Sequence, residues 1–92
     1  MFTTVSIHQM LPGTEKKAIE MFSIGTRIAR KLKGFISRDI LIGVDDPLKL
    51  TTLTSWQTME QLEAFKTTPG RPKTGAKLLS TTIMSDVNTK VS

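Results

Sequence analysis

The middle of the chain holds the feature that most limits how it can fold. Two runs rich in β-branched and aliphatic residues, FISRDILI (35–42) and LKLTTLTSW (48–56), are separated only by GVDDP. Glycine, aspartate and proline favour a tight turn, and so short a connection joins antiparallel strands. We therefore predict a β-hairpin over residues 35–56.

A strand and a helix are expected before this hairpin. The run FTTVSIHQ predicts a strand from Phe2 to Gln9, which ends before Pro12-Gly13. Small and apolar residues then recur every three or four positions, as on the buried side of a helix. We expect Thr14 to be the N-cap of this helix and Gly34 to stop it after about five turns.

A helix and a strand are expected after the hairpin. Thr58 and Gln61 have the spacing of a capping box, so the second helix is expected to begin after Thr58 and to end at Pro69-Gly70. The basic stretch that follows is expected to be a loop or to contain one helical turn over 76–79. A last strand is predicted over about 80–89.

The element order β-α-β-β-α-β predicts an α+β, ferredoxin-like fold, in which a four-stranded antiparallel sheet carries both helices on one face. The strand at 35–42 has apolar residues of both parities: Phe35 and Leu41 on one, and Ile36, Ile40 and Ile42 on the other. A sheet with one face in water alternates more cleanly. We therefore expect the second face to be covered by another copy of the chain in a homodimer.

Size and composition fit a single domain over residues 1–92. A chain of this length buries only about 60–65% of its unfolded surface, so self-association would stabilise it. The absence of cysteine excludes disulfides, zinc thiolates and thiol nucleophiles, and it favours a cytoplasmic location. No run approaches the roughly 20 apolar residues of a membrane span, and the first ten residues read as mature structure.

The net charge of +5 has a simple explanation in scattered surface lysine and arginine. Nucleic acid is not expected as a partner, because the sequence lacks the basic-aromatic run of RNA-binding sheets. A single histidine with scattered carboxylates does not predict a metal site.

The stretch LTTLTSWQTMEQLEAFKTTP resembles the signature of the antibiotic biosynthesis monooxygenase-like family. In that family a strand ends in Trp, and a Ser or Thr, an acidic residue, an inward aromatic residue and a Ser/Thr-Pro stop follow. The matching residues here are Trp56, Thr58, Glu60, Phe65 and Thr68-Pro69. LPGTEKKAIEMF and KGFISRDILIGVDDPLKL resemble the family's first helix and paired strands, with Lys33 where Pro is usual. The similarity spans roughly residues 3–89.

The resemblance implies a homodimeric α/β barrel with a pocket in each subunit between sheet and helices. Family activities include oxidation of polycyclic phenols to quinones without metal or flavin, and oxidative haem breakdown. No histidine follows His8, so an axial haem ligand of the family's type is absent and no cofactor is expected. The expected activity is a cofactor-independent monooxygenase acting on an aromatic or polyketide-type molecule.

Candidate binding residues follow from this resemblance. Trp56 would be a wall of the pocket, and Phe65 would point inward. The Asn and Tyr that assist the Trp in quinone-forming members are replaced by Thr52 and Leu62, of which only Thr52 can donate a hydrogen bond. Trp56 could equally be a structural plug between the third strand and the second helix.

Candidate catalytic residues are fewer. His8 shares a strand face with Ser6, and its ordinary pKa near 6.5 would suit removal of a phenolic proton. Arg71 lies where some family members use a basic residue to stabilise an enolate or phenolate. His8 as a partly exposed hydrogen-bonding residue and Arg71 as a solvated loop charge are the alternatives. Arg38 and Asp39 must point to opposite faces, and the sequence leaves open which is inward.

Two functions are therefore open at the level of sequence. One is the small oxygenase, with His8 as base and Thr52, Ser6 and Arg71 as hydrogen-bond donors. The other is a non-catalytic dimeric module that binds a small ligand, which the missing Asn and Tyr favour.

Overall fold

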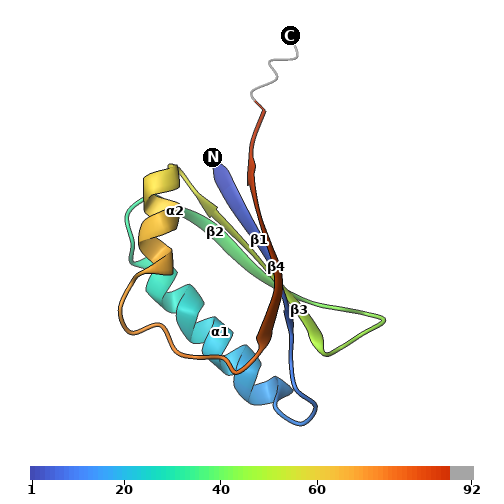
Figure 1. Cartoon of the computed structure of the whole chain (residues 1–92). Helices are drawn as coiled ribbons and strands as arrows, with labels where there is room; N and C mark the ends of the chain where they lie inside the picture. The colour runs from blue at the N-terminus through green and yellow to red at the C-terminus, as the bar shows by residue number, and fades with distance from the viewer. Residues whose placement is uncertain (88–92) are drawn as a thin grey trace.

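A computed structural model describes residues 1–87 of the chain (Figure 1). The elements run in the order β1 (Phe2–Gln9), α1 (Glu15–Arg30), β2 (Phe35–Ile42), β3 (Lys49–Trp56), α2 (Met59–Lys66) and β4 (Lys77–Ser85). The ferredoxin-like order β-α-β-β-α-β is thus confirmed.

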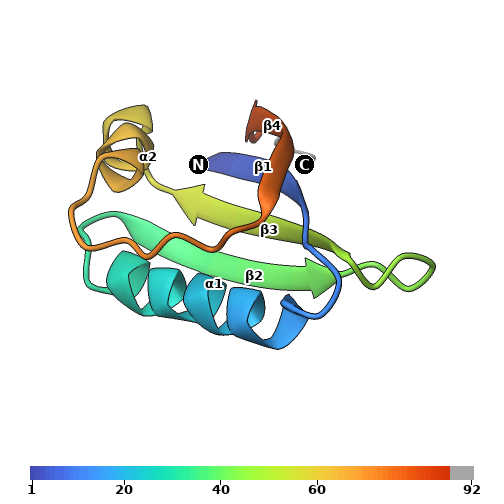
Figure 2. The same cartoon turned by 60° about the horizontal axis from the view of Figure 1, so that its bottom comes forward.

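The four strands form one antiparallel sheet in the order β2-β3-β1-β4. Both helices lie on the same face of this sheet, with α1 running beside β2 and α2 beyond the end of β3 (Figures 1 and 2). The long loop from α2 to β4 returns over the helix layer before it joins the sheet edge (Figure 2). Neither helix of residues 1–87 lies on the other face of the sheet.

The core between sheet and helices is divided into two clusters. The first packs Met10, Ala18, Phe22 and Leu50 at one end of α1. The second packs Ala29, Trp56, Leu62 and Phe65 at the other end, where α1 and α2 meet. Polar and charged side chains lie on the sheet between these clusters, and they form the cavity described below.

Helix α1 begins after Thr14, as predicted, but it lacks a side-chain cap and ends earlier than predicted. Thr14 occupies the N-cap position, but its hydroxyl donates to the Leu11 carbonyl (2.7 Å) and does not cap the helix. The helix ends at Arg30, four residues before Gly34. Tight bonds from the amides of Lys31 and Leu32 to carbonyls three residues back turn the chain out of the helix. Gly34 then reverses it with φ 85°.

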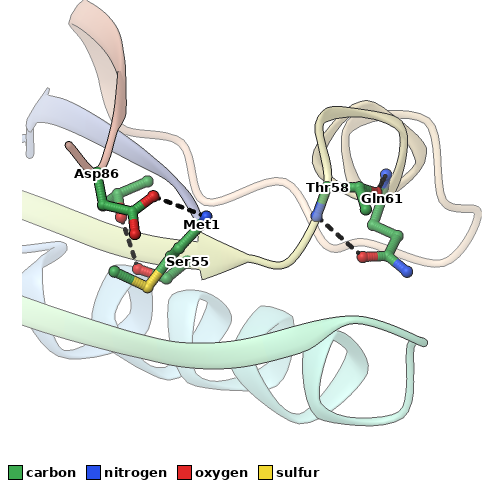
Figure 3. Close-up of polar contacts among 6 residues, drawn as sticks. Met1, Ser55, Thr58, Gln61 and Asp86 are labelled. Atoms are coloured by element: carbon green, nitrogen blue, oxygen red, sulfur yellow. Dashed lines mark hydrogen bonds and ion pairs between the residues drawn. The ribbon is translucent and has the colours of Figure 1, made fainter. Parts of the chain in front are cut away.

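Helix α2 begins with the predicted capping box. The backbone amide of Gln61 donates to Thr58 Oγ1, and the backbone amide of Thr58 donates to Gln61 Oε1, each at 3.2 Å (Figure 3). Two orphan amides at the helix start are thereby satisfied. The same view shows Met1 joined to Asp86 by an ion pair of 2.8 Å, which ties the start of β1 to the end of β4.

The last strand begins earlier than predicted. β4 starts at Lys77, so the optional helical turn over 76–79 is wrong: Lys77 and Leu78 pair with Gln9 and His8 of β1. Pairing with β1 gives these backbone groups partners that a single isolated turn would leave to water. A bulge between Ile7 and His8 shifts the register there. The predicted end near Thr89 lies outside the described residues.

The two faces of β2 also differ from the prediction in one respect. Phe35 and Leu41 were expected to share a face, but a register shift between Phe35 and Ser37 reverses the parity at the start of the strand. Phe35 packs on the helix side, edge-on to Trp56 with ring centroids 5.6 Å apart. Leu41 lies on the open face and is 49% exposed.

The open face carries an apolar strip across the sheet. Val5 and Leu53 are register partners at its centre, and Ile7, Leu41 and Met84 extend the strip. Leu41 and Met84 are 49% and 55% exposed in residues 1–87. Neither helix in residues 1–87 has the length and apolar character to cross a membrane.

Candidate functional site

A cavity of about 390 Å³ lies between the sheet and the helices. Every strand, both helices and the loop after α2 contribute to its wall. The lining residues are Thr4, Ser6, His8, Phe22, Arg38, Thr52, Thr54, Trp56, Leu62, Phe65, Lys66, Arg71, Leu78 and Thr81.

Strand alternation explains the polar floor of this cavity. In β1, Thr4, Ser6 and His8 fall on the helix side, while Val5 and Ile7 fall on the open face. In β3 the same alternation places the hydroxyls of Thr52 and Thr54 beneath the helices, where these residues are 4% and 3% exposed. The floor is therefore a row of hydroxyl groups with one imidazole.

Trp56 forms one end of the cavity. It is 1% exposed and packs against Phe35 and Phe65, with 5.3 Å between the centroids of Trp56 and Phe65. These contacts join β3 to α2, as the structural plug requires. Trp56 also contributes to the cavity wall, so one residue meets both descriptions given by the sequence.

His8 lies on the cavity floor against α1. Its ring contacts Phe22 edge-on, with centroids 4.8 Å apart. Burial, aided by the positive charge of Arg38, lowers the pKa of His8 below its ordinary 6.5. The imidazole is therefore neutral at pH 7. Its Nδ1 is buried and has no hydrogen-bond partner within residues 1–87.

Arg38 enters the cavity from β2 and is held by two threonines. Its Nε donates to Thr26 Oγ1 at 3.0 Å and its Nη1 donates to Thr54 Oγ1 at 2.9 Å. Burial, and secondarily the charge of Arg71, lowers the pKa of Arg38 to about 10. The guanidinium still carries its charge at neutral pH. Asp39, the neighbouring residue, is exposed and forms no part of the cavity wall.

Arg71 approaches the same place from the loop after α2. Its guanidinium carbon lies 4.1 Å from the Phe65 ring centroid, a cation–π distance, and its Nη1 donates to the Phe65 carbonyl at 3.2 Å. Arg38 lies over the same ring at 5.4 Å. Burial lowers the pKa of Arg71, although part of the side chain is exposed.

The charges around the cavity are all positive. Its lining includes Arg38, Lys66 and Arg71 but no aspartate or glutamate. Lys66 has a partner in Glu63 at 3.4 Å, whereas neither arginine has an ion pair with a described residue. Within residues 1–87, no group of three His, Asp or Glu side chains is arranged to hold a metal ion.

The structure brings all six sequence-predicted site residues into this one cavity: Ser6, His8, Thr52, Trp56, Phe65 and Arg71. Leu62, which stands where the family has Tyr, also lines it. The sequence left Arg38 unassigned because parity alone could not tell which of Arg38 and Asp39 faces inward. Thr54 was missed, although it has the same strand parity as Thr52.

Sequence comparison adds no relatives to this picture. No protein-family sequence profile matches the chain, and no curated protein matches it in sequence.

The fold, by contrast, is shared with many solved antibiotic biosynthesis monooxygenases and related proteins. One such monooxygenase superposes with a TM-score of 0.81 and 13% identity, covering 95% of this chain and 99% of that one. At this level of identity the likeness establishes the fold.

Two further structures show the same likeness. SnoaB, a cofactor-independent oxygenase from Streptomyces nogalater, gives a TM-score of 0.82 at 12% identity, covering 99% and 97% of the two chains. A candidate antibiotic biosynthesis monooxygenase from Deinococcus radiodurans gives 0.85 at 9% identity, covering 97% and 95%. The fold resemblance noted in the sequence is thereby confirmed.

Proposed function

We propose that this chain is a small cofactor-independent monooxygenase of the antibiotic biosynthesis monooxygenase-like family, acting on an aromatic or polyketide-type molecule. The observation that carries the proposal is the single cavity in which a neutral imidazole, a row of hydroxyls and aromatic walls come together. SnoaB, which has this fold, is a cofactor-independent oxygenase, and that likeness supports the same reaction class here.

The chemistry needs a base and a site that stabilises negative charge. His8, neutral at pH 7, takes a proton from an activated position of the ligand. The ligand anion reduces O₂ and combines with it to give a hydroperoxide. Loss of water then leaves a carbonyl, so one oxygen atom enters the product and the other leaves as water. All the electrons come from the ligand.

The remaining side chains bind and orient the ligand. Trp56 and Phe65 give flat surfaces on which a planar ring can stack. Ser6 and Thr52 supply hydrogen-bond donors on the floor, and Arg71 stabilises the charge that deprotonation creates.

We further propose that the chain works as a homodimer whose open sheet faces pack together. Val5, Ile7 and Leu53 on this face are half-buried, and Leu41 and Met84 are exposed. Large apolar side chains gathered on one open face support this arrangement, since exposed apolar patches mark interaction sites. A cytoplasmic location stays a prediction from the cysteine-free composition.

An oxygen electrode tests the activity directly. Purified protein with anthrone, in buffer treated with a chelator, should take up one O₂ per molecule of anthraquinone formed, at least about tenfold faster than buffer. His8→Ala should remove about 10²–10⁴-fold of the chemical rate. Trp56→Phe, which keeps a flat ring, should retain most of it.

A rate equal to buffer, or one unchanged in His8→Ala, would contradict the proposal. Leu62 favours a second function in that case, because it brings no hydroxyl where the family has Tyr. The chain would then be a binding module, and a thermal-shift screen would find ligands that raise its melting temperature without being turned over.

A further inference from the structure

We infer that the ligand of this cavity carries a carboxylate, bound by Arg38 together with Arg71, in addition to the aromatic ring that reacts. This inference rests on the proposed function for the identity of the reacting ring. The binding of the carboxylate is a separate property and can be tested without turnover.

The two arginines of the cavity carry positive charge that no acidic side chain of residues 1–87 balances. The two guanidinium groups face the same Phe65 ring, so their carbons can lie no farther apart than the sum of 5.4 and 4.1 Å. Neither has a carboxylate partner within residues 1–87, and no acidic side chain lines the cavity. Like charges held close together in a partly buried place destabilise the empty protein.

Arg38 is held in place by uncharged groups. Thr26 and Thr54 bind its Nε and Nη1 through neutral hydroxyls, which orient the guanidinium without neutralising it. Its Nη2 points toward Gly25 of α1, where an added Cβ would lie 3.7 Å away. The guanidinium is thus fixed in direction while keeping N–H groups for a ligand, since an arginine has five. An arginine needed only for folding would more simply be paired with an acid.

A carboxylate differs from the phenolate of the reaction because its charge is present before catalysis. Deprotonation by His8 gives the ligand one negative charge, and that charge forms only during catalysis. Besides Lys66, which is paired with Glu63, the cavity offers two positive charges that are present before any ligand enters. A permanent carboxylate balances one of them on binding, and the developing oxyanion balances the other. Planar guanidinium groups also match the geometry of a carboxylate, with two parallel hydrogen bonds.

Isothermal titration with a matched pair of probes tests this inference. 2-Naphthoate and 2-naphthamide have the same rings and differ in charge. We expect wild-type protein to bind 2-naphthoate roughly 10–100-fold more tightly than 2-naphthamide, the range for hydrogen bonds to a charged group. This preference should shrink as sodium chloride is raised, and it should not need oxygen.

Substitutions show which residues cause the preference for 2-naphthoate over 2-naphthamide. Arg38→Gln should bring the two dissociation constants within about threefold of each other, and Arg38→Lys should keep part of the difference. Arg71→Gln should reduce the preference as well, and it serves if Arg38→Gln fails to fold. Lys16→Gln removes the same charge from an exposed position outside the cavity and should leave the preference unchanged.

Equal affinity of wild-type protein for the two probes would overturn the inference, as would the absence of measurable 2-naphthoate binding. A preference that survives in both arginine variants would also overturn it. Each of these three results leaves the oxygenase proposal to its own test of oxygen uptake. Conversely, a strong preference for 2-naphthoate in a protein that takes up no oxygen would support the carboxylate site while removing the oxygenase.

Discussion

His8 is the base in the proposed reaction, and it can be followed alone because the chain has no other histidine. Burial favours its neutral form, so its pKa in the folded chain lies below 6.5. A neutral imidazole accepts a proton at physiological pH. The same burial would make a protonated His8 costly, since no acidic side chain lines the cavity beside it.

The pH dependence of this group is the first prediction. An NMR titration should give one histidine resonance with a pKa below 6.5. Between that value and 6.5 the unfolded chain binds more protons than the folded chain, so the free energy of unfolding should rise with pH across this window. It should be flat above the window for this group. In His8→Gln the rise should be smaller, and a wild-type pKa at or above 6.5 would contradict the burial described here.

Individual site residues differed in how far sequence could place them. Ser6 and His8 were assigned to one strand face by alternation, which a regular strand obeys. Arg38 could not be assigned, because its strand has apolar residues of both parities and begins with a register shift at Phe35. The position of its side chain in the cavity depends on contacts with Thr26 and Thr54, from two other elements, and with Phe65. Sequence spacing does not reveal such contacts.

At the scale of elements, the turn between α1 and β2 is held by one glycine. Gly34 has φ 85°, and a Cβ there would overlap Gln61 Oε1. Gln61 cannot move aside freely, because this oxygen accepts the Thr58 amide in the capping box. Gly70 has the same φ but nothing within 4 Å of an added Cβ, so it is a matched control.

Alanine substitutions separate these two effects. Gly70→Ala should lower the free energy of unfolding by about 1–2 kcal/mol, from the left-handed backbone alone. Gly34→Ala should cost a further ~1 kcal/mol, because the Thr58–Gln61 bond is lost as well. Urea denaturation measures both. Equal losses in the two variants would show that the contact with Gln61 contributes nothing.

The two helix starts make a second comparison. Thr58 accepts the Gln61 amide, whereas the Thr14 hydroxyl donates to a carbonyl and caps no amide. Thr58→Ala should therefore cost about 1 kcal/mol in urea denaturation, and Thr14→Ala should cost less than half of that. A loss in Thr14→Ala equal to the loss in Thr58→Ala would mean that the two cap positions contribute alike to stability.

Element order was predictable because each boundary has its own local chemistry. Pro-Gly and Gly-Val-Asp-Asp-Pro turns, the capping box and β-branched runs all act within a few residues. The start of β4 was not predictable in the same way. Its residues Lys77 and Leu78 are extended because β1 pairs with them, and a bulge in that pairing sets the register. Such long-range pairing leaves no local signal.

At the scale of the whole molecule, the two faces of the sheet differ in character. The helix side holds the cavity, with its hydroxyls, imidazole and arginines. The open side holds the apolar strip of Val5, Ile7, Leu41, Leu53 and Met84. A chain of 92 residues has little core of its own, so covering this strip would contribute a large share of its stability.

A charge placed in the strip should therefore separate the subunits. Leu53 is at the centre of the sheet on β3, and Leu53→Glu would bury a carboxylate without a partner in the dimer. Val44 is an equally apolar residue at the tip of the hairpin and is 95% exposed. Val44→Glu changes the charge by the same amount and should leave association intact.

We predict that one face of the sheet binds ligand and that the other binds a second copy. Sedimentation velocity at micromolar concentration tests it most directly. Wild-type protein and Val44→Glu should sediment with twice the mass of one chain, and Leu53→Glu should sediment as a single chain. A wild-type protein that is folded and sediments as one chain at this concentration would contradict the claim.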